Sequence, residues 1–156
     1  MTAKDGAIGP LRPRGDLGFG VGGLYSFCRW LSRVAAITFY DFRVYGVRWL
    51  PSSGPTVIAS NHQSLLDPCT VGMIPDRRYC YLAKESLFRI PFLGWLIRHV
   101  GSFPIPRESV SARRALDTTI RILETGRAMV MFPEGTRSPD GRLQPLKRGI
   151  GLIVRR

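Results

Sequence analysis

Two residue types suited to acid–base chemistry stand close together near the middle of this 156-residue sequence: His62, preceded by Asn61, and Asp67 five positions later. A carboxylate that accepts a hydrogen bond from one imidazole nitrogen fixes the tautomer of the ring and leaves the other nitrogen free to take a proton from a hydroxyl group. A purely structural interpretation is also open, in which Asp67 caps a helix and His62 is an ordinary loop residue.

The spacing of this pair restricts the backbone between them. On a continuous helix only residues three or four apart share a face, so His62 and Asp67 can meet only where the intervening residues are partly non-helical. Pro68 favours that geometry, because the residue before a proline is pushed away from helical backbone while proline suits a first helical position. The apolar run that begins at Thr56 predicts a buried strand, followed by a polar loop and a helix that ends at about Met73.

Strand and helix patterns alternate along the rest of the chain. Short apolar runs predict buried strands at 79–83 and 128–132, and an aromatic run predicts another strand at 42–49. The segment 101–107 is expected to be extended. Strands that alternate with helices favour an α/β fold, in which a mainly parallel sheet is covered by helices.

The predicted helices of the second half have recognisable breaks and ends. Between 88 and 100 an apolar segment is interrupted by Pro91 and Gly94, which predicts a short helix, a bend and a second helix. A later helix, capped by Ser109 or Ser111, ends at Gly126. Its buried stripe is predicted at Leu116, Ile120 and Leu123, and its solvated face at Arg113, Arg114 and Arg121.

The N-terminal part combines a flexible composition with an amphipathic helix. Residues 1–23, rich in glycine and proline, are expected to form a flexible tail ahead of one domain over 24–156. From 24 to about 40, apolar residues recur at three- and four-residue steps, with Arg29 and Arg33 on the polar face. These charges argue against a membrane-spanning helix, which needs about 18 apolar residues. The helix either packs on the domain or, with its many aromatic neighbours, lies on a membrane surface, and both can hold together.

The charge balance predicts an anionic partner. Lysine and arginine number 23 against 11 acidic residues, a net charge of +12, which suits nucleic acid, a phosphate-bearing substrate or an anionic membrane. No block of five like charges resembles a nucleic-acid-binding arm. Three cysteines without metal-site spacing predict reduced thiols in the cytosol and no structural zinc. The N-terminus lacks the apolar core of a signal peptide, so secretion is not expected.

Three stretches match a known pattern in their order and spacing: Asn61-His62-Gln-Ser-Leu-Leu-Asp67, Gly101-Ser-Phe-Pro-Ile-Pro-Arg107 and Phe132-Pro-Glu-Gly-Thr-Arg-Ser138. They resemble the first three motifs of the PlsC-type glycerolipid acyltransferases, which are 1-acylglycerol-3-phosphate acyltransferases. The likeness covers roughly residues 24–150, and its first and third motifs are the specific ones. It implies transfer of a fatty acyl group from acyl-CoA or acyl-carrier protein to the free hydroxyl of a lysophospholipid, most typically lysophosphatidic acid. The product would be phosphatidic acid, and neither a metal nor a bound cofactor is implied.

The resemblance implies roles for the residues of the three motifs. His62, oriented by Asp67, would be the general base that takes the proton of the attacking hydroxyl. Asn61 would hold the loop through backbone bonds. Arg107 and Arg137 would bind the acceptor phosphate, because a guanidinium group matches two phosphate oxygens at once.

Five further residues complete the expected acceptor site. Glu134 cannot bind a phosphate directly, so we expect it to hydrogen-bond the glycerol or to orient an arginine. Gly135 allows close backbone approach. Lys84, at the end of a predicted strand, is expected to contact a phosphate or oxyanion unless it is simply a solvated lysine. Gly101 and Thr136 are assigned to the acceptor site by the resemblance alone.

The C-terminal end and the cellular location are also matters of expectation. Members of the family continue past the position of Gly149 through a helix, a strand and a fourth motif, which this sequence does not contain. We therefore expect C-terminal strands to be missing, with an exposed sheet edge, weak stability and little activity for residues 1–156 alone. The expected location is peripheral or monotopic, on the cytoplasmic face of the cell membrane.

Other functions remain open at this point. The acceptor could be another lysophospholipid, glycerol-3-phosphate or a lyso-aminolipid. The chain could also be a catalytically inert basic module, because each lysine or arginine near an anionic leaflet contributes about 1 kcal/mol of attraction. Nucleic-acid binding is a third possibility that charge supports, but no recognised nucleic-acid-binding fold or aromatic RNA-binding signature occurs in the sequence.

Overall fold

The computed structural model describes residues 22–74, 77–105 and 111–155. The predicted tail over 1–23 therefore lies outside the described residues, apart from its last two, which belong to the first helix. Arg107 and Ser109 are also outside them.

Four strands of the described chain form one parallel sheet, which confirms the predicted α/β fold. The strands are β1 (Thr56–Ala59), β2 (Tyr79–Lys84), β3 (Ser102–Ile105) and β4 (Ala128–Met131), and their order across the sheet is β1-β4-β2-β3. Every neighbouring pair is parallel. Their carboxyl ends therefore share one edge, called here the carboxyl edge, and their amino ends share the opposite edge, the amino edge.

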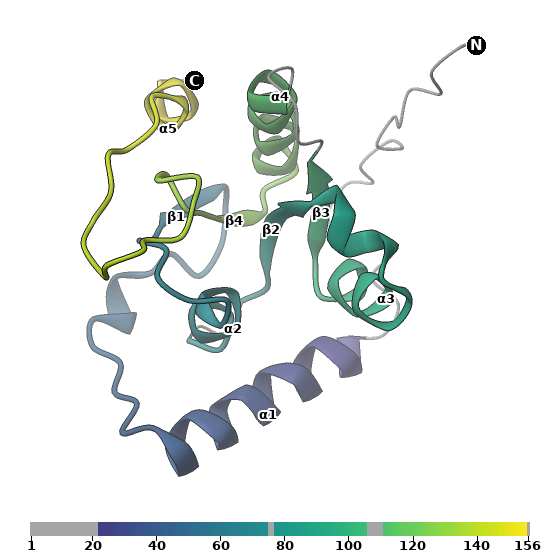
Figure 1. Ribbon diagram of the computed structural model, residues 1–156, viewed down its shortest axis with the longest axis vertical. Helices are drawn as coiled ribbons and strands as arrows, with labels where there is room; N and C mark the ends of the chain where they lie inside the picture. Colours follow the sequence, from purple (N-terminus) through teal and green to yellow (C-terminus); the bar gives the residue numbers. More distant parts are fainter. Residues whose placement is uncertain (1–21, 75–76, 106–110, 156) are drawn as a thin grey trace.

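Helices cover both faces of this sheet (Figure 1). The chain forms α1 (Gly22–Phe39), α2 (Asp67–Gly72), α3 (Pro91–His99), α4 (Ser111–Glu124) and α5 (Gly149–Val154), with 3₁₀ turns η1 (Val47–Trp49) and η2 (Glu85–Arg89). In Figure 1, α1, α2 and α3 lie on one side of the sheet and α4 lies on the other. This division follows from right-handed crossovers, since the chain moves one way across the sheet through α2 and α3 and returns through α4.

The core divides into two clusters because side chains of a strand alternate between faces. On one face Tyr79, Tyr81, Ala128 and Val130 pack with Ile58, Val71 and Phe132. On the other, Cys80, Met129 and Ile122 of α4 pack with Leu82, Phe103, Leu123 and Met131. Phe132, directly after β4, extends the first cluster towards the carboxyl edge.

The predicted strand at 42–49 is wrong. Gly46 adopts a left-handed backbone, φ 76°, and η1 follows it. Tyr45 and Trp49 are exposed. Aromatic residues favour strands only where a neighbouring strand and a packed face are available, and the four strands of the described sheet do not include this segment.

The predicted short helix, bend and second helix occur as η2, the extended residue Ile90 and α3, and Gly94 lies inside α3. Gly94 is buried against the backbone of Phe88, and a β-carbon there would overlap the Phe88 carbonyl group. The glycine thus permits η2 and α3 to pack closely. Pro91 does begin α3, as the break in the sequence pattern predicted.

The buried residues of α4 differ from the predicted stripe. Thr119 and Ile122 are the fully buried ones, while Leu116, Ile120 and Leu123 are half-buried. Thr119 tolerates burial because its hydroxyl donates a hydrogen bond to the Ala115 carbonyl, 2.8 Å away. The solvated face is confirmed, with Arg113, Arg114 and Arg121 all exposed.

The first helix forms as predicted but packs with an unexpected face towards the domain. Tyr25 and Ala36 are its buried residues. Arg33, expected on the polar face, donates hydrogen bonds to the carbonyl groups of Met73 (2.7 Å) and Ile74 (3.2 Å) just after α2. Phe27, Leu31 and Val34, which belong to the expected apolar pattern, are exposed, and with exposed Trp30 and Ile37 they form an outward stripe.

Candidate active site at the carboxyl edge

The imidazole of His62 and the carboxylate of Asp67 form the pair that the sequence predicted. His62 Nδ1 and Asp67 Oδ2 are 2.8 Å apart, and both side chains are about one fifth exposed. The pair can meet because residues 61–64 form an irregular loop and Asp67 is the first residue of α2. Asp67 is thus not merely a helix cap, since its carboxylate turns back to the loop instead of bonding within the helix.

The carboxylate of Asp67 is stabilised in its charged form. Partial burial alone would raise its pKa, but hydrogen bonds from the Ser64 N–H, the His62 ring and the Gln63 N–H outweigh that cost and lower the pKa below the usual value of 3.8. The two backbone bonds are 2.8 Å and 2.7 Å long. An ionised carboxylate can only accept hydrogen bonds, so Nδ1 of His62 is the donor, and in the neutral ring Nε2 carries the lone pair.

The main chain of His62 is fixed by residues that follow β4. Its N–H donates to Oε1 of Glu134 over 2.9 Å, and its carbonyl accepts a hydrogen bond of 2.7 Å from the Ser138 N–H. The two loops lie side by side because β1 and β4 pair in register up to Ala59 and Met131. The ring itself stacks on Phe132, with centroids 4.2 Å apart and planes inclined by 21°.

Glu134 is buried, with only 3% of its surface exposed, and both of its oxygens accept backbone hydrogen bonds. Oε1 bonds the His62 N–H, and Oε2 bonds the Gln144 N–H over 3.3 Å. No described arginine pairs with Glu134, and Arg107 lies outside the described residues, so the expectation that Glu134 orients an arginine stays a prediction.

The residues after Glu134 form an exposed, cationic turn. Gly135 has φ 70°, which favours glycine, and its N–H donates to the Phe132 carbonyl. The side chain of Lys147 lies directly against Gly135, so a β-carbon there would meet its ammonium group. Thr136 and Arg137 follow and are both exposed. The turn therefore presents two cations, on Arg137 and Lys147, near the loop that carries His62.

The remaining predicted residues are placed in different parts of the fold. Asn61 is exposed between β1 and His62, and its carbonyl accepts a hydrogen bond from the Ser60 hydroxyl. Lys84 is exposed at the carboxyl end of β2. Gly101 lies at the amino end of β3 with φ 95°, so the fold does not bring it to His62, and its backbone explains the glycine. Arg107 follows β3 but lies outside the described residues.

Several residues of the site carry little signal in the sequence. Phe132 and Ser138 belong to the third motif, yet only the fold shows that they stack on the His62 ring and bind its carbonyl. Gln144 is found only through its backbone N–H. Lys147 lies beside Arg148 in a basic segment of the sequence, which could have suggested a binding role. Its position against Gly135, however, depends on the turn after β4.

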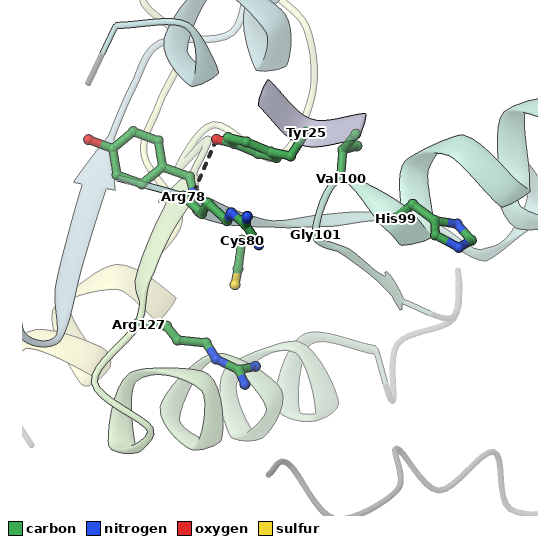
Figure 2. Close-up of a pocket in the computed structure, with 8 residues that line it drawn as sticks. Tyr25, Arg78, Cys80, His99, Val100, Gly101 and Arg127 are labelled. Atoms are coloured by element: carbon green, nitrogen blue, oxygen red, sulfur yellow. Dashed lines mark hydrogen bonds between the residues drawn. The ribbon is translucent and has the colours of Figure 1, made fainter. Parts of the chain in front are cut away.

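A small cavity lies at the amino edge instead of beside His62. Tyr25, Arg78, Cys80, Gly101 and Arg127 line it, together with Tyr79, His99 and Val100 (Figure 2). Its volume of about 20 Å³ is enough for one water molecule. No cluster of three potential metal ligands occurs among the residues that the structure describes.

The chain is similar to known proteins along most of its length. A family model described as Acyltransferase matches residues 41–156. The chloroplastic 1-acyl-sn-glycerol-3-phosphate acyltransferase BAT2 of Brassica napus is 38% identical over 80% of this chain and 36% of its own length. The 1-acyl-sn-glycerol-3-phosphate acyltransferase of Bacillus subtilis is 32% identical over 84% of this chain and 65% of its own.

The fold has a solved counterpart as well. The crystal structure of the 1-acyl-sn-glycerophosphate acyltransferase PlsC from Thermotoga maritima superposes with a TM-score of 0.67 at 29% identity, over 83% of this chain and 52% of that one. The chain therefore spans from about a third to about two thirds of the length of these relatives. The family match over 41–156 and the shared fold together establish that this chain belongs to the acyltransferase family.

Proposed function

We propose that the protein transfers a fatty acyl group from acyl-CoA or acyl-carrier protein to the free hydroxyl of 1-acylglycerol-3-phosphate, giving phosphatidic acid. The observation that carries this proposal is the 2.8 Å contact between His62 Nδ1 and Asp67 Oδ2. It leaves Nε2 to act as a base. The relatives from Brassica napus and Bacillus subtilis are named for this acceptor, which supports the choice of substrate.

The proposed reaction needs one base and no metal or bound cofactor. The acceptor hydroxyl loses its proton to Nε2 of His62 as its oxygen attacks the thioester carbonyl carbon. The carbon–sulfur bond then breaks, and the leaving thiolate takes the proton back from the imidazolium. Asp67 stabilises that imidazolium and keeps the ring oriented, and base catalysis of this kind contributes about 10²–10⁴-fold in rate.

Recognition of the acceptor phosphate is assigned to the cations of the carboxyl edge. Arg137 is exposed on the turn whose main chain is bonded to His62, and a guanidinium group binds two phosphate oxygens at once. Thr136 can add a hydroxyl bond from the same turn. Lys84, the last residue of β2, supplies further positive charge from the same edge of the sheet, and Arg107 is assigned to the phosphate by its motif alone.

The site is proposed to work at the surface of an anionic membrane, with the protein peripheral or monotopic on the cytoplasmic face. Support comes from the outward stripe of α1, where Ile37 is 74% exposed, and from exposed Tyr45 and Trp49. Aromatic side chains favour the headgroup region, and the net charge of +12 attracts anionic lipid. Within the part of the chain that the structure describes, no helix has the length and hydropathy of a membrane span.

An acceptor panel tests the proposed function. Vesicles of phosphatidylglycerol and phosphatidylcholine would carry lysophosphatidic acid, lysophosphatidylcholine, a lyso-aminolipid or, in solution, glycerol-3-phosphate. With labelled acyl-CoA or acyl-carrier protein, we expect the highest kcat/KM for lysophosphatidic acid. A higher value for a different acceptor would overturn the choice of substrate. Binding to the vesicles with no transfer to any acceptor would identify an inert membrane module instead.

The membrane part of the proposal has its own measurement. Sedimentation with the same vesicles should decrease several-fold when Trp30 and Ile37 on the outer face of α1 are replaced by serine, because apolar contact area is lost. A matched control replaces Arg113 and Arg121 on the exposed face of α4, which lies across the sheet. Equal losses in both variants would indicate that charge alone, without α1 insertion, causes binding.

A further inference from the structure

We propose that Glu134 is a positioning residue for His62 and does not bind the acceptor. This inference rests on the proposed function, in which His62 is the base, and it assigns Glu134 differently from the expectation that it would bond the glycerol. The carboxylate would act through the main chain of His62 and would not touch substrate.

Both carboxylate oxygens of Glu134 accept hydrogen bonds from the backbone. Oε1 accepts the His62 N–H at 2.9 Å and Oε2 accepts the Gln144 N–H at 3.3 Å. The side chain is 97% buried, since only 3% of its surface is exposed. Because so little of Glu134 is exposed and each oxygen already accepts a backbone hydrogen bond, a glycerol hydroxyl has little room to approach this carboxylate.

The backbone of His62 is held in place by hydrogen bonds from another part of the chain. It lies in a loop of irregular backbone between β1 and α2, where no helix or strand bonds fix its position. Glu134 bonds its N–H and the Ser138 N–H bonds its carbonyl, so both polar groups of its peptide backbone are fixed by the segment after β4. A third link joins the same two loops, because the Gln63 side-chain amide donates to the Gly141 carbonyl at 2.8 Å.

The direction of the His62 imidazole ring depends on the position of its backbone. With the His62 backbone fixed by Glu134, the ring lies between two further contacts, the stacked face of Phe132 and the carboxylate of Asp67. A shift of the backbone would change the Nδ1 to Oδ2 distance and the direction of Nε2 together. Misplacement of a catalytic group by about 1 Å can cost about 100-fold in rate.

The same bonds favour a glutamate over a glutamine in this position. Oε1 and Oε2 bond residues from two separate loops, so the carboxylate joins the His62 loop to the 138–144 segment. Gln144 in turn donates from its side chain to Asp140 Oδ1 and to the Arg142 carbonyl. A glutamine could accept only one of the two backbone bonds, since its NH₂ group is a donor.

Steady-state kinetics of Glu134→Ala and Glu134→Gln test this assignment. We expect kcat to fall about 100-fold in the alanine variant and less in the glutamine variant, with KM for lysophosphatidic acid unchanged in both. Glu124→Gln, an exposed glutamate at the end of α4, is the matched control and should behave as wild type. If Glu134→Ala does not fold, as judged by its thermal transition, Glu134→Gln alone decides.

A second readout is independent of acyl transfer. The ¹⁵N chemical shifts of the His62 ring should report one fixed tautomer, protonated at Nδ1, in the neutral wild-type site, and a mixture of tautomers in Glu134→Gln. Arg137→Ala should leave these shifts unchanged. Wild-type ring shifts and wild-type kcat, combined with a KM raised at least 10-fold in Glu134→Gln, would show that Glu134 binds the acceptor and would overturn the inference. If wild-type protein acylated no acceptor, the proposed function would fail, while the ring shifts would still decide the role of Glu134.

Discussion

The two edges of the sheet collect polar residues in different ways. At the amino edge a small cavity is enclosed by Tyr25 of α1 and by side chains from the starts of β2 and β4, with the Tyr25 hydroxyl accepting the Tyr79 N–H at 3.4 Å (Figure 2). Figure 2 shows the His99 ring turned away from the other labelled side chains. At the carboxyl edge, hydrogen bonds instead fix His62, Asp67 and Glu134 in one arrangement.

This difference shows why a cavity and a shifted pKa do not by themselves identify an active site. Burial raises the pKa of the Cys80 thiol to about 11 and also raises that of Tyr25, and for both groups desolvation is the largest cause of the shift. Asp67 has a pKa lowered by specific hydrogen bonds that also orient a histidine. A specific hydrogen-bond partner, and not the size of a pKa shift, identifies a group that could take part in a reaction.

Asp67→Asn should produce the largest difference between the two edges. The amide cannot stabilise an imidazolium and permits the wrong tautomer of His62, a change that costs about 10⁴-fold in kcat in a comparable histidine–aspartate pair. Tyr25→Phe, which removes a hydroxyl at the amino edge, should leave kcat unchanged. Rates of labelled acyl transfer measure both effects, and equal losses in the two variants would contradict the separation of roles.

Two arginines offer a matched comparison of smaller size. Arg137→Ala at the carboxyl edge should raise KM for lysophosphatidic acid about 10-fold or more with little change in kcat, because a charge-assisted hydrogen bond contributes about 1.5–3 kcal/mol. Arg78→Ala at the amino edge should leave KM unchanged. Its guanidinium lies 5.6 Å from the centre of the Tyr25 ring, and loss of that contact should lower the free energy of unfolding by about 0.5–1 kcal/mol. An increase in KM for Arg78→Ala would indicate that the phosphate binds at the amino edge, and would contradict its assignment to the carboxyl edge.

The two edges should also lose stability at opposite ends of the pH scale, which is the smallest effect. The folded pKa of Asp67 is lowered, so its contribution to the free energy of unfolding is complete above pH 3.8 and is lost as pH falls through the folded value. The folded pKa of Cys80 is raised, so its contribution is complete below pH 9.0 and is lost between pH 9.0 and about 11.

Denaturant unfolding across pH measures these contributions separately. Asp67→Asn should flatten the decrease in stability below pH 3.8, and Cys80→Ala should make the decrease above pH 9.0 less steep. Tyr25, Tyr79 and Tyr81 also have raised pKa values, so the alkaline decrease should persist in part. Unchanged acid and alkaline slopes in the two variants would contradict the assigned shifts.

Local sequence patterns predicted the parallel sheet and the contact between His62 and Asp67. The spacing and Pro68 permit His62 and Asp67 to meet in one loop, and the resemblance of the three motifs to a known family favoured this pairing over a simple helix cap. Side chains whose partners are backbone groups on distant loops were not predictable, since the His62 and Gln144 N–H groups that bind Glu134 leave no trace in residue type.

Two differences between expectation and structure have the same physical origin. Arg33 was expected on the polar face of an amphipathic helix, and the carbonyl groups after α2 bind that face to the domain. The aromatic segment at 42–49 has residues typical of strands, yet strand formation depends on a neighbouring strand that the sequence pattern does not specify. In both cases a contact between distant parts of the chain outweighs the local preference.

The central claim is that Nε2 of His62 removes the proton from the acceptor hydroxyl. Its most direct test is the kcat of acyl transfer to lysophosphatidic acid in anionic vesicles for wild-type protein and His62→Asn, with His99→Asn as the histidine control at the end of α3. We expect His62→Asn to lose at least about 100-fold in kcat while His99→Asn keeps the wild-type rate. A wild-type kcat in His62→Asn would contradict the account.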